Sequence, residues 1–219
     1  MERDEAVRSW KARRRTSPGQ AADLARLGPA YAVAVDRPLD APAVFGRSAP
    51  LVLEIGSGTG EATAAMAAAD PSRDVLAVEV HTPGVAALLR RVESLGLRNV
   101  RVVEADALLV LTELVASGSL DEVRVFFPDP WPKSRHAKRR LVSPAFASLV
   151  ADRLRPGGRL HVATDWPSYA EHARRVLDDS PALVVVGQDR GERPVTRFEA
   201  RGCAAGRAPH DLVAVRAAG

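Results

Sequence analysis

A carboxylate fixed between two prolines is the part of this sequence best suited to chemistry. Asp129 lies in the run Phe127-Pro-Asp-Pro-Trp-Pro-Lys133. Proline restricts its own backbone and that of the preceding residue, so Pro128 and Pro130 limit where the Asp129 side chain points. A carboxylate held in this way can stabilise positive charge that develops during a reaction. Trp131 follows it and can stack on a base, although packing in the core is an equally good interpretation.

A basic segment comes directly after the proline-flanked acid. Its basic and titratable side chains are Lys133, Arg135, His136, Lys138, Arg139 and Arg140. No acidic residue occurs between Pro130 and Ala151. Such a segment can neutralise several phosphates of a nucleic acid. A solvated basic helix face is the commoner explanation of a charge run, but the position beside Asp129 favours RNA contact.

A glycine-rich loop upstream predicts a nucleotide-type cofactor. Leu51-Val-Leu-Glu-Ile is followed by Gly56-Ser-Gly58-Thr-Gly60. The dinucleotide fingerprint requires G-x-G-x-x-G, and Glu61 occupies the place of its third glycine. Glu54, just before the loop, would repel a pyrophosphate, whereas it would attract the ammonium and sulfonium groups of S-adenosylmethionine. The loop therefore favours S-adenosylmethionine over a nicotinamide dinucleotide.

Two further acids end the next two predicted strands. Glu79 is placed to accept the ribose hydroxyls of a nucleoside, and Asp106 is placed to reach an adenine amino group. Each acid alone can be a solvated loop carboxylate, and Asp106 is also suited to cap a helix. Acids at three successive strand ends instead favour a cofactor pocket, since ligands of open parallel sheets bind beyond these ends.

The elements that position these residues alternate along the chain. Apolar runs predict strands over 51–55, 74–80, 100–105, 122–127 and 159–164, and helical patterns fall over 60–69, 84–95, 107–117, 143–154 and 168–178. Pro156-Gly157-Gly158 predicts a sharp turn from a helix into a strand. Residues 184–186 and 212–215 predict two more strands, as an antiparallel edge pair. The pattern predicts an α/β fold with a doubly wound, mostly parallel, Rossmann-like sheet and an antiparallel edge hairpin.

The length of 219 residues favours one domain with modest extensions. Residues 1–48 lack a strong hydrophobic period and predict a basic N-terminal arm with short helical pieces, and residues 49–219 predict the catalytic domain. No acidic residue occurs between Ala6 and Ala22, and this stretch holds Arg8, Lys11, Arg13, Arg14 and Arg15.

Composition excludes several other classes of protein. No run of about 18 uncharged apolar residues predicts a membrane span, and the N-terminus lacks the apolar region of a secretory signal. Cys203 is the only cysteine and the five histidines show no ligand spacing, so we expect no metal site. The simplest expectation is a soluble, cytoplasmic protein, as a monomer or homodimer.

With these motifs the chain resembles the bacterial tRNA (guanine-N7-)-methyltransferases, from about Arg8 to Leu212. The run 128–133 followed by Arg135-His-Ala-Lys-Arg-Arg-Leu141 is highly specific, and the later run Arg193-Pro-Val-Thr-Arg-Phe-Glu-Ala-Arg-Gly202 agrees with it. The glycine loop is shared by many methyltransferases. The fold implied is that of class I S-adenosylmethionine-dependent methyltransferases.

The resemblance implies methyl transfer from S-adenosylmethionine to N7 of guanosine in tRNA, at position 46 of the variable loop. It implies that Glu54, Glu79, Asp106 and Asp129 contact the methyl donor, with Asp129 also catalytic. Substrate contacts fall on Lys133, Asp165, Thr196, Arg197, Phe198 and Glu199, and RNA contacts fall on 135–140. Trp10 and Lys11 look unusual for the family, and Arg197 stands where lysine is common.

Plainer interpretations of these last positions remain open. Asp165 is also suited to cap the helix predicted over 168–178, and Thr196 with Glu199 has the spacing of a capping box.

Guanine N7 bears a lone pair and no proton, so its methylation requires placement against the activated methyl group but no obligatory base. Three other functions remain as alternatives: a methyltransferase acting on another RNA base or an exocyclic amine, a nicotinamide dehydrogenase, and a non-catalytic RNA-binding module.

Overall fold

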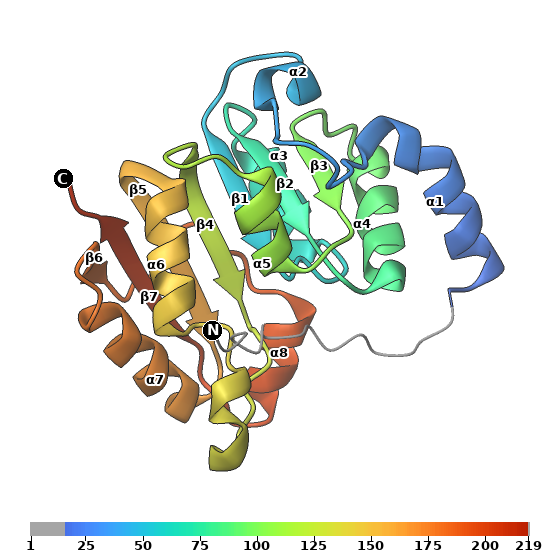
Figure 1. The fold of residues 1–219 in the computed structure, drawn as a ribbon. Coiled ribbons are helices and arrows are strands. Elements are labelled where there is room, and N and C mark those ends of the chain that lie inside the picture. The colour runs from blue at the N-terminus through green and yellow to red at the C-terminus, as the bar shows by residue number, and fades with distance from the viewer. Residues whose placement is uncertain (1–15, 219) are drawn as a thin grey trace.

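The computed structural model describes residues 16–218, which fold around one seven-stranded sheet (Figure 1). The strands lie in the order β3-β2-β1-β4-β5-β7-β6. Their bounds are β1 Leu51–Ile55, β2 Asp74–Val78, β3 Val100–Val103, β4 Leu120–Phe126, β5 Leu154–Thr164, β6 Leu183–Gly187 and β7 His210–Arg216. Strands β1 to β5 pair in parallel, and β7 pairs antiparallel with β5 and β6. The predicted mostly parallel sheet with an antiparallel edge is confirmed.

Helices cover both faces of this sheet. Their bounds are α1 Pro18–Tyr31, α2 Ala41–Phe45, α3 Glu61–Ala69, α4 Thr82–Ser94, α5 Ala107–Leu109, α6 Pro144–Arg153, α7 Pro167–Asp178 and α8 Arg197–Ala204. A π-helix, η1, spans Val110–Leu114 and a 3₁₀ helix, η2, spans Ser134–Arg139. Among the described residues no helix is both long and apolar enough to cross a membrane.

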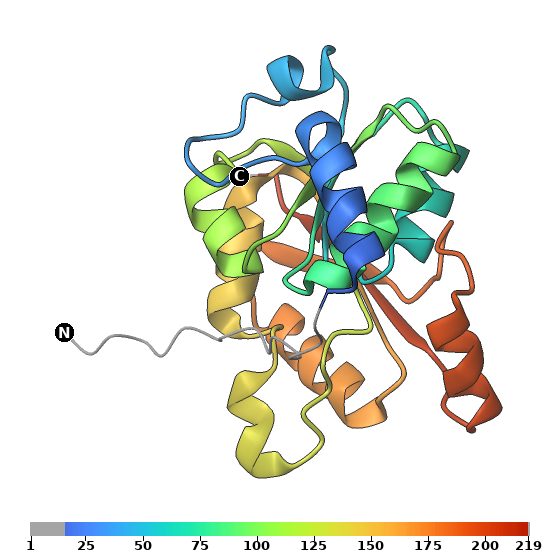
Figure 2. The ribbon, with the colours of Figure 1, turned by 90° about the vertical axis from the view of Figure 1, so that its right-hand side faces the viewer.

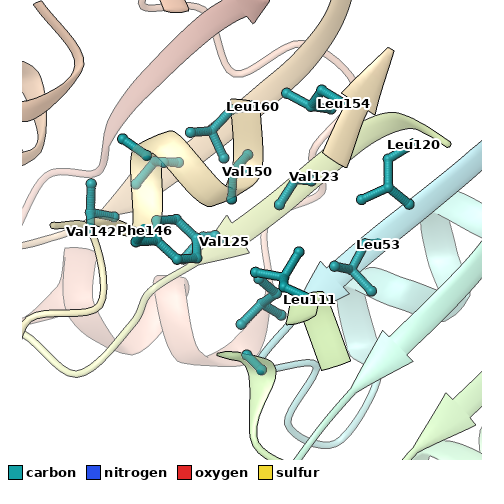
Figure 3. Close-up of a cluster of buried hydrophobic side chains, with 14 of the residues drawn as sticks. Leu53, Leu111, Leu120, Val123, Val125, Val142, Phe146, Val150, Leu154 and Leu160 are labelled. Carbon is teal, nitrogen blue, oxygen red and sulfur yellow. The ribbon is translucent and has the colours of Figure 1, made fainter. Parts of the chain in front are cut away.

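The two faces bury separate apolar clusters because strand side chains alternate between them. On one face, Leu53, Val123 and Leu160 of the sheet pack with Leu111 and with Phe146 of α6 (Figure 3). The other face packs the sheet against α3 and α4, with further buried residues at Leu27, Val52, Ala64, Val75, Leu88 and Val100. This double covering is why the parallel strands are almost continuously apolar.

Two element predictions are wrong in detail. The helix predicted over 107–117 is a short α5 followed by the π-helix, which ends at Leu114. Thr112 explains part of this irregularity, because its hydroxyl donates to the carbonyls of Leu108 and Leu109. Strand β5 begins at Leu154, which pairs with Leu120, so Pro156-Gly157-Gly158 lies inside an irregular strand and not between helix and strand.

Part of the predicted N-terminal arm packs on the domain. Helix α1 begins with a capping box at Ser17 and buries Leu27 against α4 (Figure 2). The Arg26 guanidinium donates to the Glu93 carboxylate of α4 at 2.8 Å. The basic residues from Arg8 to Arg15 lie outside the described part of the chain. The division at residue 48 stays a prediction.

Candidate active site

A cavity of about 370 Å³ opens at the carboxyl ends of β1, β2, β3 and β4. It lies where the strand order reverses between β1 and β4, as expected for ligands of open parallel sheets. Its volume is within the range of small-molecule sites. Residues that follow each of the four strands line it, among them Gly56, Glu79, His81, Ala105, Asp106, Leu108, Phe127, Asp129, Trp131 and Arg139.

The glycine loop is closed on itself and offers little to a phosphate. The Gly58 N–H donates to Glu79 Oε2 at 2.7 Å, and the N–H groups of Gly56 and Ser57 donate to Val78 O. The Gly60 N–H donates to Ser57 O. Phosphate-binding loops instead present free N–H groups to the ligand. At Gly56, Ser57, Gly58 and Gly60 the N–H groups are already bound within the chain, which argues against a dinucleotide.

Gly60 is required by packing as well as by conformation. It adopts a φ of +74°, in the region that favours glycine, and caps the N-terminus of α3. A Cβ at this position would overlap the side chain of Leu88 on α4. The third glycine therefore lets α3, α4 and the loop approach one another closely.

Glu79 holds the loop and lines the cavity at the same time. Its Oε1 accepts the N–H groups of Val80 and His81, both at 2.8 Å, while Oε2 accepts that of Gly58. A carboxylate has about four acceptor positions. Three of these positions accept N–H groups of the chain, so about one remains for a ligand hydroxyl. To bind both ribose hydroxyls, Glu79 would have to accept two donors at one position.

Asp106 combines the two roles considered from the sequence. It lines the cavity, and its Oδ1 accepts the Leu108 N–H at 2.8 Å as the N-cap of α5. Capping fixes the carboxylate at the end of β3. A structural cap and a ligand contact are therefore compatible here.

Glu54 lies beneath the loop and not on the cavity wall. Its side chain is buried, Oε1 accepts the hydroxyl of Thr63 at 2.9 Å, and Oε2 has no hydrogen-bond partner among the described residues. Burial raises the pKa of this carboxyl to about 7, although nearby Arg124 acts in the opposite direction. The structure thus separates Glu54 from the acids that line the cavity.

Asp129 is the exposed acid of the cavity. Its carboxylate has no hydrogen bond or ion pair within residues 16–218. The backbone on either side is unusual, since Phe127 has a φ of +53° and Trp131 a φ of +42°. Bulky residues rarely adopt such angles and do so only where their surroundings enforce them. The chain therefore projects Asp129 outward by a strained turn.

The lining residues fit S-adenosylmethionine. Carboxylates of Glu79, Asp106 and Asp129 suit hydroxyl, amino and sulfonium groups. The buried Nε2 of His81 has no hydrogen-bond partner among the described residues, although His81 lines the cavity. A buried polar atom of this kind is a natural partner for a bound ligand. No group of acidic, histidine or cysteine side chains within residues 16–218 is arranged to hold a metal ion.

The basic segment divides into exposed and buried members. Lys133, Arg135, Lys138 and Arg139 are exposed, and His136 is half-buried. The Arg139 guanidinium lies 5.0 Å from the centre of the Trp131 ring, which His136 contacts edge-on. Of the four exposed cations, Arg139 lines the cavity, and the other three lie in the same segment of the chain.

Arg140 is used inside the protein. It is 7% exposed, donates to the carbonyls of Pro130 and Ser168, and lies over the ring of Tyr169. That Arg140 contacts RNA stays a prediction, and in this structure its guanidinium is bound inside the protein. The reason is that a 3₁₀ helix ends before it, so its side chain turns toward α7.

The start of α8 lies beside the glycine loop and the Asp129 turn. Thr196 caps α8 by accepting the Glu199 N–H at 3.2 Å, and the Arg197 N–H donates to Glu61 Oε2 at 3.0 Å. The half-exposed Phe198 ring contacts the Phe127 ring, with centres 5.3 Å apart. Figure 2 shows α8 (orange-red) and the 3₁₀ helix (yellow) at the same end of the molecule.

Two of the expected substrate residues are buried in ion pairs. Asp165 accepts Arg207 Nε at 2.8 Å and does not cap α7, whose N-cap is Trp166. Glu199 is 1% exposed and pairs with Arg190 and Arg193. Neither carboxylate lines the cavity. Thr196 and Glu199 do not form a full capping box. The Glu199 carboxylate does not accept the Thr196 N–H, because it is bound by these two arginines.

Sequence reasoning did not assign roles to His81, Phe127 or Arg193. His81 lies two positions after Glu79, and Arg193 is the first residue of the late motif, so the only signal in the sequence was closeness to these motifs. Phe127 carries no signal, because a positive φ at a phenylalanine is imposed by its neighbours.

Comparisons with known proteins point to methyltransferases. A family model described as "Putative methyltransferase" matches residues 48–212. The chain is 48% identical over 187 residues to the tRNA (guanine-N(7)-)-methyltransferase of Nitrosomonas eutropha, covering 84% of each chain. It is 47% identical to the protein of that name from Paracidovorax citrulli, over 97% of this chain and 88% of that one. A solved structure of an antibiotic-related methyltransferase, 18% identical, matches 84% of this chain and 93% of that one with a TM-score of 0.59, which supports the fold.

Proposed function

The chain belongs to the tRNA (guanine-N(7)-)-methyltransferase family, and we propose that the cavity at the ends of β1 to β4 is its active site. The reaction transfers a methyl group from S-adenosylmethionine to N7 of a guanosine in tRNA. The observation that carries the proposal is the position of Asp129. Its free carboxylate stands between an acidic cavity and an exposed basic segment.

We assign the methyl donor to the acidic part of the cavity. Glu79 and Asp106 would bind its hydroxyl and amino groups, and Gly56, Gly58 and Gly60 would shape the floor beneath it. Glu54 would support this floor through Thr63 of α3. When bound, S-adenosylmethionine supplies an activated methyl group on a sulfonium.

Asp129 would act as the catalytic residue. N7 of guanine has no proton to lose, so the carboxylate need not act as a base. The purine ring gains positive charge on methylation, and a fixed carboxylate stabilises charge that develops there. The strained turn at Phe127 and Trp131 holds this carboxylate outward before substrate arrives, which avoids reorganisation during the reaction.

We assign tRNA to the face beyond Asp129. Lys133, Arg135, Lys138 and Arg139 would contact phosphates, with His136 beside them, and Phe198 and Arg197 at the start of α8 would contact the substrate. Thr196 would act through its cap, and Asp165 and Glu199 through their ion pairs. We propose guanosine 46 of the variable loop as the target and the cytoplasm as the location.

Methyl transfer to defined transcripts tests this assignment. Labelled S-adenosylmethionine is incubated with the enzyme and unmodified tRNA, and the product nucleosides are separated. We expect 7-methylguanosine from a transcript with guanosine at position 46, and no labelled product from the same transcript with adenosine there. A labelled product other than 7-methylguanosine would refute the activity, and 7-methylguanosine from both transcripts would refute only the position. Size-exclusion chromatography with light scattering separates monomer from homodimer.

A further inference from the structure

A buried charge network lies behind the Asp129 turn. Arg193 is 2% exposed and binds two carboxylates at once. Its Nε and Nη2 donate to Asp211 of β7 at 2.8 and 2.7 Å, and its Nη1 donates to Glu199 of α8 at 2.6 Å. His161 of β5 contacts the same Asp211 oxygen as Arg193 Nε, at 2.8 Å. One guanidinium thus joins strand β7 to α8.

The opposing charges of this buried network favour the ionised form of each partner. Burial alone would lower the pKa of Arg193, but its bonds to Asp211 and Glu199 outweigh burial and raise it. Burial would likewise raise the pKa of Asp211, but the bonds from His161 and Arg193 hold it at about 2. Arg193 is therefore charged, and a buried charge requires its partners to stay in place.

The guanidinium also contacts the aromatic residues that precede Asp129. Its central carbon lies 5.6 Å from the centre of the Phe126 ring and 5.1 Å from that of Phe127. A cation over an aromatic face is attracted more strongly when both are desolvated. The His161 ring packs edge-on against Phe126, with ring centres 5.0 Å apart.

Phe127 needs such contacts, because its φ of +53° is unfavourable for a phenylalanine. Its N–H donates to Ala163 O at 2.7 Å, and its ring is held by Phe198 and Arg193. We infer that Arg193 is a positioning residue, which enforces the strained Phe127 turn and thereby sets the position of Asp129. This inference rests on the proposed function of Asp129.

The same network defines what Glu199 does. Both of its carboxylate oxygens accept from arginine: Oε1 from Arg190, and Oε2 from Arg190 and Arg193. Glu199 therefore fixes Arg193 relative to α8. Within the late motif, Arg193 and Glu199 therefore act through the geometry of the Asp129 turn.

Replacement of Arg193 by methionine tests the inference by two measurements. We expect kcat to fall at least about tenfold, while the dissociation constants for S-adenosylmethionine and tRNA change less than about threefold. Arg193→Lys keeps the charge without the planar fork and should recover part of the activity. Hydrogen exchange at the Phe127 N–H should accelerate in Arg193→Met, with no change across Asp74–Val78 of β2.

A matched control and a double variant complete the test. Arg174→Met removes an exposed arginine of α7 that pairs with Asp178, and should leave kcat and exchange at Phe127 unchanged. Phe127→Leu should lower kcat, and adding Arg193→Met should lower it little further, because both changes disturb one turn.

The inference is overturned if folded Arg193→Met keeps the wild-type kcat, or if the two effects multiply in the double variant. If Arg193→Met does not fold, Arg193→Lys with wild-type kcat and wild-type exchange overturns it. If neither the wild type nor Arg174→Met methylates tRNA, the proposed function is refuted instead. The exchange measurement is independent of activity and separates these outcomes.

Discussion

The buried carboxyl of Glu54 should make the stability of the protein depend on pH. Glu54 lies under the glycine loop with one oxygen bound to Thr63 and the other without a hydrogen-bond partner in the described chain. Burial raises its pKa from 4.5 to about 7. Glu54→Gln keeps the size of the side chain and an acceptor for Thr63, and it removes the titration.

The sign and size of the effect follow from this shift. Between pH 4.5 and 7 the folded protein keeps a proton on Glu54 that the unfolded chain has lost. Stability therefore falls as pH rises through this window. At about 1.4 kcal/mol per pKa unit, the shift corresponds to about 3 kcal/mol. Relative to wild type, Glu54→Gln should gain up to that amount of unfolding free energy between pH 4.5 and 8.

Urea unfolding of both proteins at several pH values between 4.5 and 8 measures this difference. The measured quantity is how the difference in unfolding free energy between the two proteins changes with pH. Any effect of the amide that does not depend on pH therefore cancels. Glu171→Gln, on the exposed side of α7, is the control for loss of a carboxylate. Parallel stability profiles of wild type and Glu54→Gln would refute the reasoning. The affinity of Glu54→Gln for S-adenosylmethionine separately tests whether Glu54 contacts the donor.

Three further predictions concern the site. Asp129→Asn should lower methyl transfer at saturating donor and tRNA by about 10²–10³ with little loss of tRNA affinity; near-normal turnover would make Asp129 a turn residue, and rescue by acetate would indicate a protonated target atom. Arg139→Ala should reduce the slope of log affinity for tRNA against log salt concentration by about one; an unchanged slope would indicate a solvated face. Arg140→Ala should instead lower the melting temperature, because it leaves a cavity over the ring of Tyr169. Glu79→Ala should weaken S-adenosylmethionine binding at least about tenfold and leave tRNA affinity nearly unchanged; unchanged donor affinity in calorimetry would remove Glu79 from the cofactor site.

The order of the elements and the cavity edge could be predicted because they depend on local patterns. Apolar runs of strand length, separated by helical periods, specify alternating strands and helices. Parallel strands bring Gly56, Glu79, Asp106 and Asp129 to one edge of the sheet. The π-helix at Val110–Leu114 was missed, because one threonine hydroxyl competing for backbone carbonyls leaves no trace in the hydrophobic period.

The sequence by itself determined the fold class, the nature of the cofactor and the identity of the acid between the prolines, since spacing and residue type suffice for these. Only the tertiary structure decided which charged groups line the cavity. Glu54, Arg140 and Glu199 look like site residues in the sequence, yet each is buried. The positive φ of Phe127 and its contact with Arg193, 66 positions later in the chain, likewise arise only when the segment before α8 packs against the end of β4. A buried charge is fixed by partners from distant segments, and no local pattern specifies those partners.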